Sequence, residues 1–213
     1  MVNLTWIGLL IVSAVLVYVH WRTSQKMQMT YKDPEKAAIG FLERGMEYYV
    51  AGRFSALPGR SIVVSGNIMH HAVEMLLKGA LCKAQNHSQQ QIRGMGHNLK
   101  RAWKAFKRAF PDPRLNRFDS AVKDLNKFED LRYPDKLLST GMTGMLILKR
   151  AHLAQTNVTS TKGPTLPQYA YVIEDVDELV KLIFEVGSIN PQFFQVPTRA
   201  LEVLREENDH PVL

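Results

Sequence analysis

The sequence predicts an all-α protein, in which a helical bundle follows a single transmembrane helix. Two observations support this prediction. Apolar residues beyond residue 33 recur with helical spacing, and no alternating strand pattern of useful length occurs. Residues 2–19 form a mostly apolar run without a charged side chain. With 213 residues, the chain is long enough for one domain with a proper core and an appendage.

Residues 1–21 are predicted to be a membrane anchor. About 20 apolar residues span the hydrocarbon core of a bilayer. Aromatic rings favour its interfaces, and Trp6, Tyr18 and Trp21 lie near the two ends of the run. A cleaved signal peptide is the alternative, but no basic residue precedes the run and no convincing A-x-A-like cleavage site follows it. The sequence therefore favours a single span.

The charges that flank this run predict its orientation. Arg22, Lys26 and Lys32 follow the run, whereas only the terminal amine precedes it. Because positive charge stays on the cytoplasmic side, we expect the N-terminus outside and the remainder of the chain in the cytoplasm. Residues 22–32 then form a short polar tether.

Helix signals divide residues 33–190 into the predicted bundle. Asp33-Pro34-Glu35 is a strong helix start, because an acidic N-cap precedes a proline in the first turn. Glycines, prolines and polar stretches then separate further helices, which we expect at about residues 61–84, 97–110, 115–131 and 174–186. We interpret residues 139–170 as a short helix followed by a loop, and residues 191–213 as a C-terminal segment.

The composition of the chain indicates the kind of partner it binds and excludes some kinds of site. The chain carries a net charge of +7 and has a pI near 9.5, which suggests anionic partners such as nucleic acid or the inner leaflet of a membrane. Its single cysteine, Cys82, excludes an intrachain disulfide and a cysteine-based zinc cage. Cys82 lies in an apolar helix pattern, so we expect a packed thiol.

Positive charge concentrates between Ile92 and Arg117, where eight basic residues accompany one acid, Asp112. On the third predicted helix, most of these residues lie opposite the apolar stripe that contains Trp103 and Phe106. Three interpretations stay open: a solvated helix face, a surface for the phosphate backbone of nucleic acid, or a contact with anionic lipid. The candidate anion contacts are Arg93, Lys100, Arg101, Lys104, Lys107 and Arg108.

The second predicted helix carries a line of polar residues at Asn67, His71, Glu74 and Lys78. Their spacing places them along one face of a helix that is otherwise largely apolar. A buried polar network is costly unless its members satisfy one another. We therefore interpret the line either as a conformational lock for the bundle or as a ligand pocket.

Four segments follow one another in a recognisable order: FLERGMEYYVAGRF (41–54), NIMHHAVEMLLKGAL (67–81), GHNLKRAWKAF (96–106) and FEDLRYP (128–134). This order resembles the HEPN superfamily of small helical domains, over about residues 34–187. The resemblance implies a four- to five-helix up-and-down bundle that often dimerises and has a nucleotide- or RNA-related role in many members. By position, the matching residues are His71, Glu74, Lys78, His97, Asn98, Leu99, Arg132, Tyr133 and Pro134.

The chain departs from the pattern of the ribonuclease members of this superfamily. Those members resemble one another in an R-x(4–6)-H motif, whose Arg would stabilise phosphate charge while the His moves a proton. In this sequence only Arg205 and His210 match the spacing, and they lie within the last nine residues. They are weak catalytic candidates, because a chain terminus is a poor place for preorganised catalysis.

The sequence indicates neither a cofactor nor a metal. It has no phosphate-cradling glycine loop, no dinucleotide fingerprint and no H-E-x-x-H zinc motif. His70 and His71 are adjacent and point about 100° apart around a helix, which argues against their binding one metal ion together. We therefore predict no metal site.

Three functions remain open. The first is a membrane-tethered, non-catalytic HEPN-like domain that binds nucleotide, RNA or a partner protein. The second is a membrane-tethered ribonuclease effector of the toxin or phage-defence type. The third is a structural, dimeric adaptor that recruits a protein to the inner membrane face. The missing catalytic motif favours the first and the third.

Overall fold

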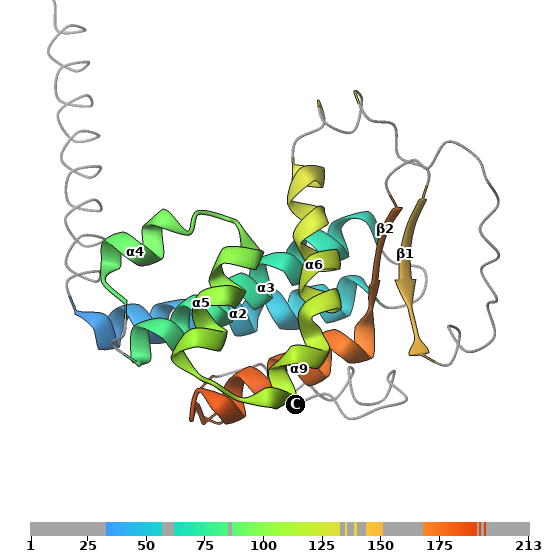
Figure 1. Cartoon of the computed structure of the whole chain (residues 1–213). Coiled ribbons are helices and arrows are strands. Elements are labelled where there is room, and N and C mark those ends of the chain that lie inside the picture. The colour runs from blue at the N-terminus through green and yellow to red at the C-terminus, as the bar shows by residue number, and fades with distance from the viewer. Residues whose placement is uncertain are drawn as a thin grey trace, which may run out of the picture.

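The computed structural model of the chain describes residues 33–56, 62–84, 87–132, 144–150 and 168–190, together with Asp135, Ser139, Gln192 and Phe194 (Figure 1). This part of the chain is mostly helical, which confirms the predicted class in outline. The predicted anchor, the tether and nearly all of the C-terminal segment lie outside the described residues. Among the described helices, none is both long and apolar enough to cross a membrane.

Two long helices, α2 (Pro34–Ser55) and α3 (Ile62–Lys83), pack side by side through most of their length (Figure 1). α2 begins as the sequence predicts, because the Asp33 carboxylate accepts hydrogen bonds from the backbone N–H groups of Glu35 at 3.1 Å and Lys36 at 3.3 Å. Gly79 permits the close approach of the two helices, since a Cβ atom there would lie 2.6 Å from Cγ of Leu42.

The next two helices are α4 (Gln89–Gly94) and α5 (Leu99–Ala109). α4 lies in a polar stretch that the sequence predicts to be a connection between two helices. A capping box explains it: Ser88 Oγ accepts from the Gln91 N–H, and the Gln91 side chain accepts from the Ser88 N–H. Asn98 caps α5 by accepting from the Arg101 N–H at 3.0 Å, so the helix predicted at about residues 97–110 is confirmed.

The helix predicted at residues 115–131 is divided into three parts. A 3-10 helix, η1 (Pro113–Phe118), leads into α6 (Asp119–Lys127), and a second 3-10 helix, η2 (Phe128–Arg132), follows it. Asp112 caps η1 by accepting from the Arg114 N–H at 2.9 Å, and Pro113 suits the first turn. Tightened 3-10 turns are frequent at the ends of α-helices, and sequence periodicity does not resolve them.

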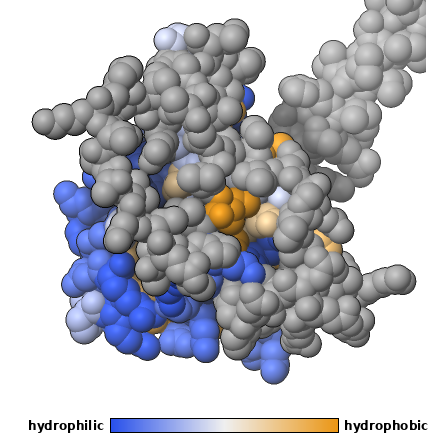
Figure 2. All heavy atoms as spheres, turned by 90° about the vertical axis from the view of Figure 1, so that its right-hand side faces the viewer, coloured by the Kyte–Doolittle hydropathy of each residue, from blue (hydrophilic) through white to orange (hydrophobic). Residues whose placement is uncertain are grey.

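A two-stranded parallel sheet shows that the interpretation of residues 139–170 as a short helix and a loop is wrong. β1 (Gly144–Leu148) pairs with β2 (Gln168–Val172), from Gly144 opposite Gln168 to Leu148 opposite Val172. A short apolar run such as MLIL does not distinguish a strand from a helix by periodicity. The side of the molecule that carries the sheet in Figure 1 faces the viewer in Figure 2, where a small apolar patch lies near the middle and hydrophilic residues gather at the lower left.

α9 (Ile173–Val186) follows β2 directly and confirms the helix predicted at residues 174–186. It packs against α3, which also contacts α4, α5, α6, η2 and β1 and is therefore the central helix. The core side chains of α3 include Met69, Val73, Leu76, Leu77 and Leu81, all fully buried. Burial also raises the pKa of the Cys82 thiol to about 11, which agrees with the expected packed cysteine.

Candidate functional site

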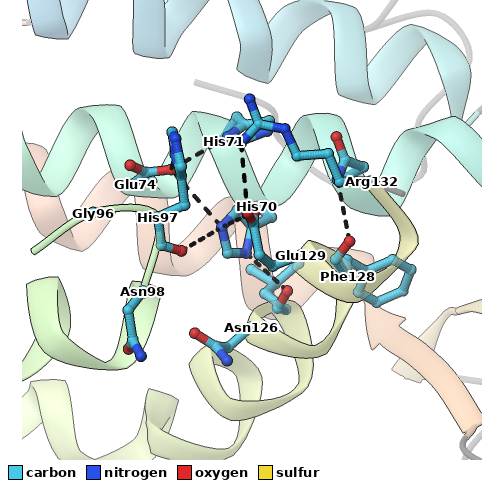
Figure 3. Close-up of polar contacts among 12 residues, drawn as sticks. His70, His71, Glu74, Gly96, His97, Asn98, Asn126, Phe128, Glu129 and Arg132 are labelled. Carbon is cyan, nitrogen blue, oxygen red and sulfur yellow. Dashed lines mark hydrogen bonds and ion pairs between the residues drawn. The ribbon is translucent and has the colours of Figure 1, made fainter. Parts of the chain in front are cut away.

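Two members of the polar line on α3, His71 and Lys78, contact the buried carboxylate of Glu74, and Figure 3 shows the histidines around this carboxylate. Nδ1 of His71 lies 3.2 Å from Glu74 Oε2, and Nδ1 of His97 lies 3.3 Å from the same oxygen. Nε2 of His70 approaches this oxygen to 3.8 Å. The Lys78 ammonium donates to the other oxygen, Oε1, at 2.6 Å. We call these five residues the Glu74 cluster.

Two parts of the chain form the Glu74 cluster. Three members, His70, His71 and Lys78, lie three or four residues from Glu74 on α3, which places their side chains within reach of its carboxylate. His97 comes from the connection between α4 and α5, and Lys78 holds that connection by donating a second hydrogen bond to the Gly96 carbonyl at 2.6 Å. The side chain of His70 is 0% exposed, whereas that of His97 is 48% exposed. The cluster therefore reaches from the core to solvent.

The electrostatics of the cluster keep Glu74 ionised. Burial opposes ionisation, but hydrogen bonds from His71, Lys78 and His97 lower the pKa of Glu74 from its ordinary value of 4.5 to about 2. Because both carboxylate oxygens have donors, the network meets the condition for a conformational lock. The exposed edge at His97 also leaves the network open to a ligand.

His70 is the most deeply buried imidazole of the cluster. Its Nδ1 lies 3.1 Å from the Leu125 carbonyl, and its Nε2 lies 3.1 Å from the His97 carbonyl and 3.4 Å from Glu129 Oε2. A neutral imidazole has one N–H and donates to only one of these oxygens. Burial lowers the pKa of His70, although the Leu125 carbonyl and Glu74 act in the opposite direction. Burial therefore favours the neutral ring.

Two further predicted residues border the cluster. Asn67 donates to the Phe128 carbonyl at 3.1 Å, so it ties α3 to η2 and lies apart from the contacts of Glu74. Nη1 of Arg132 lies 3.4 Å from Glu129 Oε1, and Arg132 thereby joins the cluster through Glu129 and His70 (Figure 3). Tyr133, the other predicted member, lies outside the described residues, as do the catalytic candidates Arg205 and His210.

Replacement of Glu74 by glutamine tests whether the cluster acts as a lock. We expect the variant to lose about 1.5–3 kcal/mol of unfolding free energy at pH 7, because hydrogen bonds to a charged group are lost. The folded pKa of about 2 lies below the ordinary 4.5, so the contribution of Glu74 is complete above pH 4.5 and declines as the pH falls towards 2. Urea unfolding of both proteins in EDTA, at pH values between 7 and 2.5, measures this difference.

Glu47→Gln is the matched control for this measurement. Glu47 is exposed and pairs with Arg44 at 2.7 Å, so its loss has little effect at any pH. A difference between wild type and Glu74→Gln that stays constant down to pH 2.5 would contradict the lock.

A second candidate site is a basic groove between α4 and α5. Its volume is about 700 Å³, and it is lined by His87, Gln91, Gly94, Met95, Arg101, Lys104, Ala105, Arg108 and Ala109. Arg101, Lys104 and Arg108 lie at i, i+3 and i+7 on α5, so they share one helix face. Within the described part of the chain, no carboxylate forms an ion pair with any of these three cations. We call this feature the α4–α5 groove.

Other cations of the basic stretch form ion pairs, some with nearby acids and some with acids of α9. Lys107 pairs with Asp119 at 2.7 Å, Arg114 pairs with Asp112 at 2.8 Å and with Glu185 at 3.1 Å, and Arg117 pairs with Glu178 at 3.2 Å. Of the six predicted anion contacts, three line the groove. Arg93 and Lys100 are exposed but do not line it, and Lys107 is engaged with Asp119.

The structure adds His70 and Glu129 to the predicted site residues. His70 precedes Glu74 by four residues, which is the spacing that also links Glu74 to Lys78, so this signal was available. Although adjacent histidines point about 100° apart around a helix, ligand atoms of His70, His71 and Glu74 all lie within 4.8 Å of one another. Nothing in the sequence shows that η2 brings Glu129 beside α3.

Comparisons of the chain with protein-family models, with curated proteins and with solved structures find no match.

Proposed function

We propose that the chain is a HEPN-like domain that binds nucleotide or RNA through its phosphate groups without catalysing a reaction. The observation that carries this proposal is the α4–α5 groove, where Arg101, Lys104 and Arg108 lie together without acidic partners among the described residues. The anchor expected at residues 1–21 would hold the domain at the cytoplasmic face of a membrane. Because of the resemblance to the HEPN superfamily, we also propose that the domain is an up-and-down bundle and that it forms a homodimer.

The groove suits a phosphate ligand in charge and size. Two guanidinium groups and one ammonium offer many N–H donors and no acceptor, which matches phosphate oxygens. Met95, Ala105 and Ala109 give the groove an apolar part against which a sugar or a base can pack. Its volume of about 700 Å³ lies within the range of small-ligand sites.

A binding experiment with single-stranded RNA tests the proposal. The full-length protein, in detergent micelles, is titrated onto a labelled oligonucleotide at salt concentrations from 50 to 400 mM. Each phosphate contact contributes about 0.7 to the slope of log affinity against log salt. The test variant combines Arg101→Gln, Lys104→Gln and Arg108→Gln. We expect it to bind RNA more weakly and to have a slope whose magnitude is smaller by about 2.

The matched control removes three cations from the same stretch that are engaged with acids: Lys107→Gln, Arg114→Gln and Arg117→Gln. The formal charge changes equally in both variants, so the control should retain the wild-type slope. If both variants lost the same amount of slope, the effect would depend on net charge alone and not on the groove. No binding of wild type at low salt would contradict RNA binding and favour the structural adaptor.

One observation supports the ribonuclease as a second candidate. His87 lines the groove beside Arg108, and its Nδ1 is buried without a hydrogen-bond partner among the described residues. Burial, followed by the charge of Arg108, lowers the pKa of His87, which favours a neutral ring able to accept a proton. Recovery of intact RNA from the binding assay favours the binding domain. Cleavage that His87→Gln abolishes would favour the enzyme.

A further inference from the structure

The surroundings of His70 contain more hydrogen-bond acceptors than its ring can serve. Nε2 faces the His97 carbonyl at 3.1 Å, Glu129 Oε2 at 3.4 Å and Glu74 Oε2 at 3.8 Å. Nδ1 faces the Leu125 carbonyl at 3.1 Å. Glu129 Oε2 is itself buried and has no hydrogen-bond donor among the described residues. The acceptors that meet here therefore call for a positively charged species between them.

One tautomer of His70 makes this position suitable for a metal ion. If Nδ1 donates its proton to the Leu125 carbonyl, Nε2 carries a lone pair, and it lies between the His97 carbonyl, Glu129 and Glu74. Metal-binding histidines commonly donate their other ring N–H to a backbone carbonyl, which fixes the orientation of the ring.

The distances around Glu74 resemble those of a tetrahedral site. With metal–ligand bonds of about 2.0–2.1 Å, ligand atoms in a tetrahedron lie about 3.3–3.4 Å apart. Nitrogen atoms of His71, His97 and His70 lie 3.2, 3.3 and 3.8 Å from Glu74 Oε2. Ligand atoms of His70, His71 and Glu74 already lie within 4.8 Å of one another, and a rotation of the exposed His97 side chain about Glu74 Oε2 would add a third nitrogen.

The groups behind these ligands are also arranged as in metal sites. Lys78 donates to Glu74 Oε1 at 2.6 Å, which fixes the carboxylate and leaves Oε2 directed at the histidines. The rings of His71 and His97 meet edge to face, with centroids 5.7 Å apart. Since the side chain of His97 is 48% exposed, an ion has a route from solvent to the cluster.

We infer that His70, His71, Glu74 and His97 form a binding site for one divalent transition-metal ion of the zinc class. Imidazole nitrogen suits zinc and its neighbours, whereas magnesium and calcium favour ligand sets made of oxygen. Glu74 and the nearby Glu129 balance the charge of the ion. The site shares no side chain with the α4–α5 groove, so the inference does not depend on the proposed function.

A zinc titration of the full-length protein in detergent micelles tests this inference. The protein is first stripped with EDTA and transferred to metal-free buffer, and zinc binding is followed by calorimetry. Cobalt(II) is the second probe, because a tetrahedral nitrogen and oxygen site gives it intense visible absorption. We expect one ion per chain, and His71→Gln and His97→Gln should each weaken zinc binding by at least about 10-fold.

His87→Gln is the matched control, because it removes a histidine that lies outside the cluster, and it should leave zinc affinity unchanged. His97→Gln tests the inference even if His71→Gln does not fold, since the side chain of His97 is 48% exposed. The inference is wrong if the wild type takes up neither ion, or if His71→Gln and His97→Gln bind as tightly as the wild type. It is equally wrong if NMR in excess zinc shows His70 doubly protonated at pH 7, because a proton then occupies the position of the ion.

Discussion

Replacement of Asp177 by alanine is expected to lower the free energy of unfolding by about 3–5 kcal/mol, because one partner of a buried charged pair is removed. Asp177 lies on α9 with its side chain 4% exposed, and its Oδ1 accepts a hydrogen bond from the Tyr49 hydroxyl at 2.6 Å. The same oxygen lies 3.4 Å from Nε of Arg53, whose side chain is 2% exposed. Alanine removes the carboxylate that contacts both the Tyr49 hydroxyl and the Arg53 guanidinium.

The state of Tyr49 reflects the same environment. Burial, together with the negative charge of Asp177, raises the pKa of the Tyr49 hydroxyl well above its ordinary value, so the hydroxyl stays protonated and donates. Asp177→Asn keeps an acceptor for this hydroxyl while removing the charge. We therefore expect Asp177→Asn to lose less stability than Asp177→Ala.

Urea unfolding at neutral pH measures both variants, with Asp124→Ala as the matched control. Asp124 forms an exposed ion pair with Lys127 at 2.7 Å, with side chains 40% and 44% exposed, and such pairs contribute about 0.2–1 kcal/mol. If Asp177→Ala lowered the free energy of unfolding no more than Asp124→Ala does, the buried contact between α2 and α9 would not stabilise the fold.

Replacement of Gly66 by alanine is the second change with a large expected effect. A Cβ atom at this position of α3 would lie 2.0 Å from Cε1 of Phe128, which is fully buried. The ring would have to leave its position, and loss of a buried phenylalanine from a core costs about 3–5 kcal/mol. We expect a loss of about 3 kcal/mol or more, at the upper end of overpacking effects.

Gly40→Ala provides a control of opposite sign. Gly40 lies within α2, and a Cβ atom there would meet nothing within 4 Å. Alanine in the interior of a helix is favoured over glycine by about 0.5–1 kcal/mol, so this variant should be more stable than the wild type. Thermal unfolding of the two variants compares the same chemical change at two sites. A Gly66→Ala protein as stable as the wild type would show that Phe128 is not packed against α3.

The sequence predicts the helices better than it predicts their limits and partners. α2, α3, α5 and α9 combine a clear apolar periodicity with local signals, such as Asp33 before Pro34 and Asn98 before α5. These signals are local, so a single sequence contains them. The pairing of β1 with β2 joins residues that lie 24 positions apart in the sequence. The local sequence indicates a strand here only through the alternation that buries Tyr169 and Tyr171.

The candidate sites show the same division between local and distant information. Helical spacing on α3 indicates His71, Glu74 and Lys78, because these residues share one element. Glu129 enters the Glu74 cluster through tertiary packing, which spacing does not encode. The basic stretch likewise predicts a charged surface, but its division into paired and unpaired cations depends on Glu178 and Glu185 of α9.

The central position of α3 has a consequence for hydrogen exchange. Because α3 contacts α2, α4, α5, α6, α9, η2 and β1, we expect the amides of its central turns to exchange with solvent only when the whole domain unfolds. His97 lies instead on a short, exposed connection, which opens at a lower free energy. A ligand can therefore enter beside His97 while the ammonium, carboxylate and imidazole groups on α3 keep their arrangement.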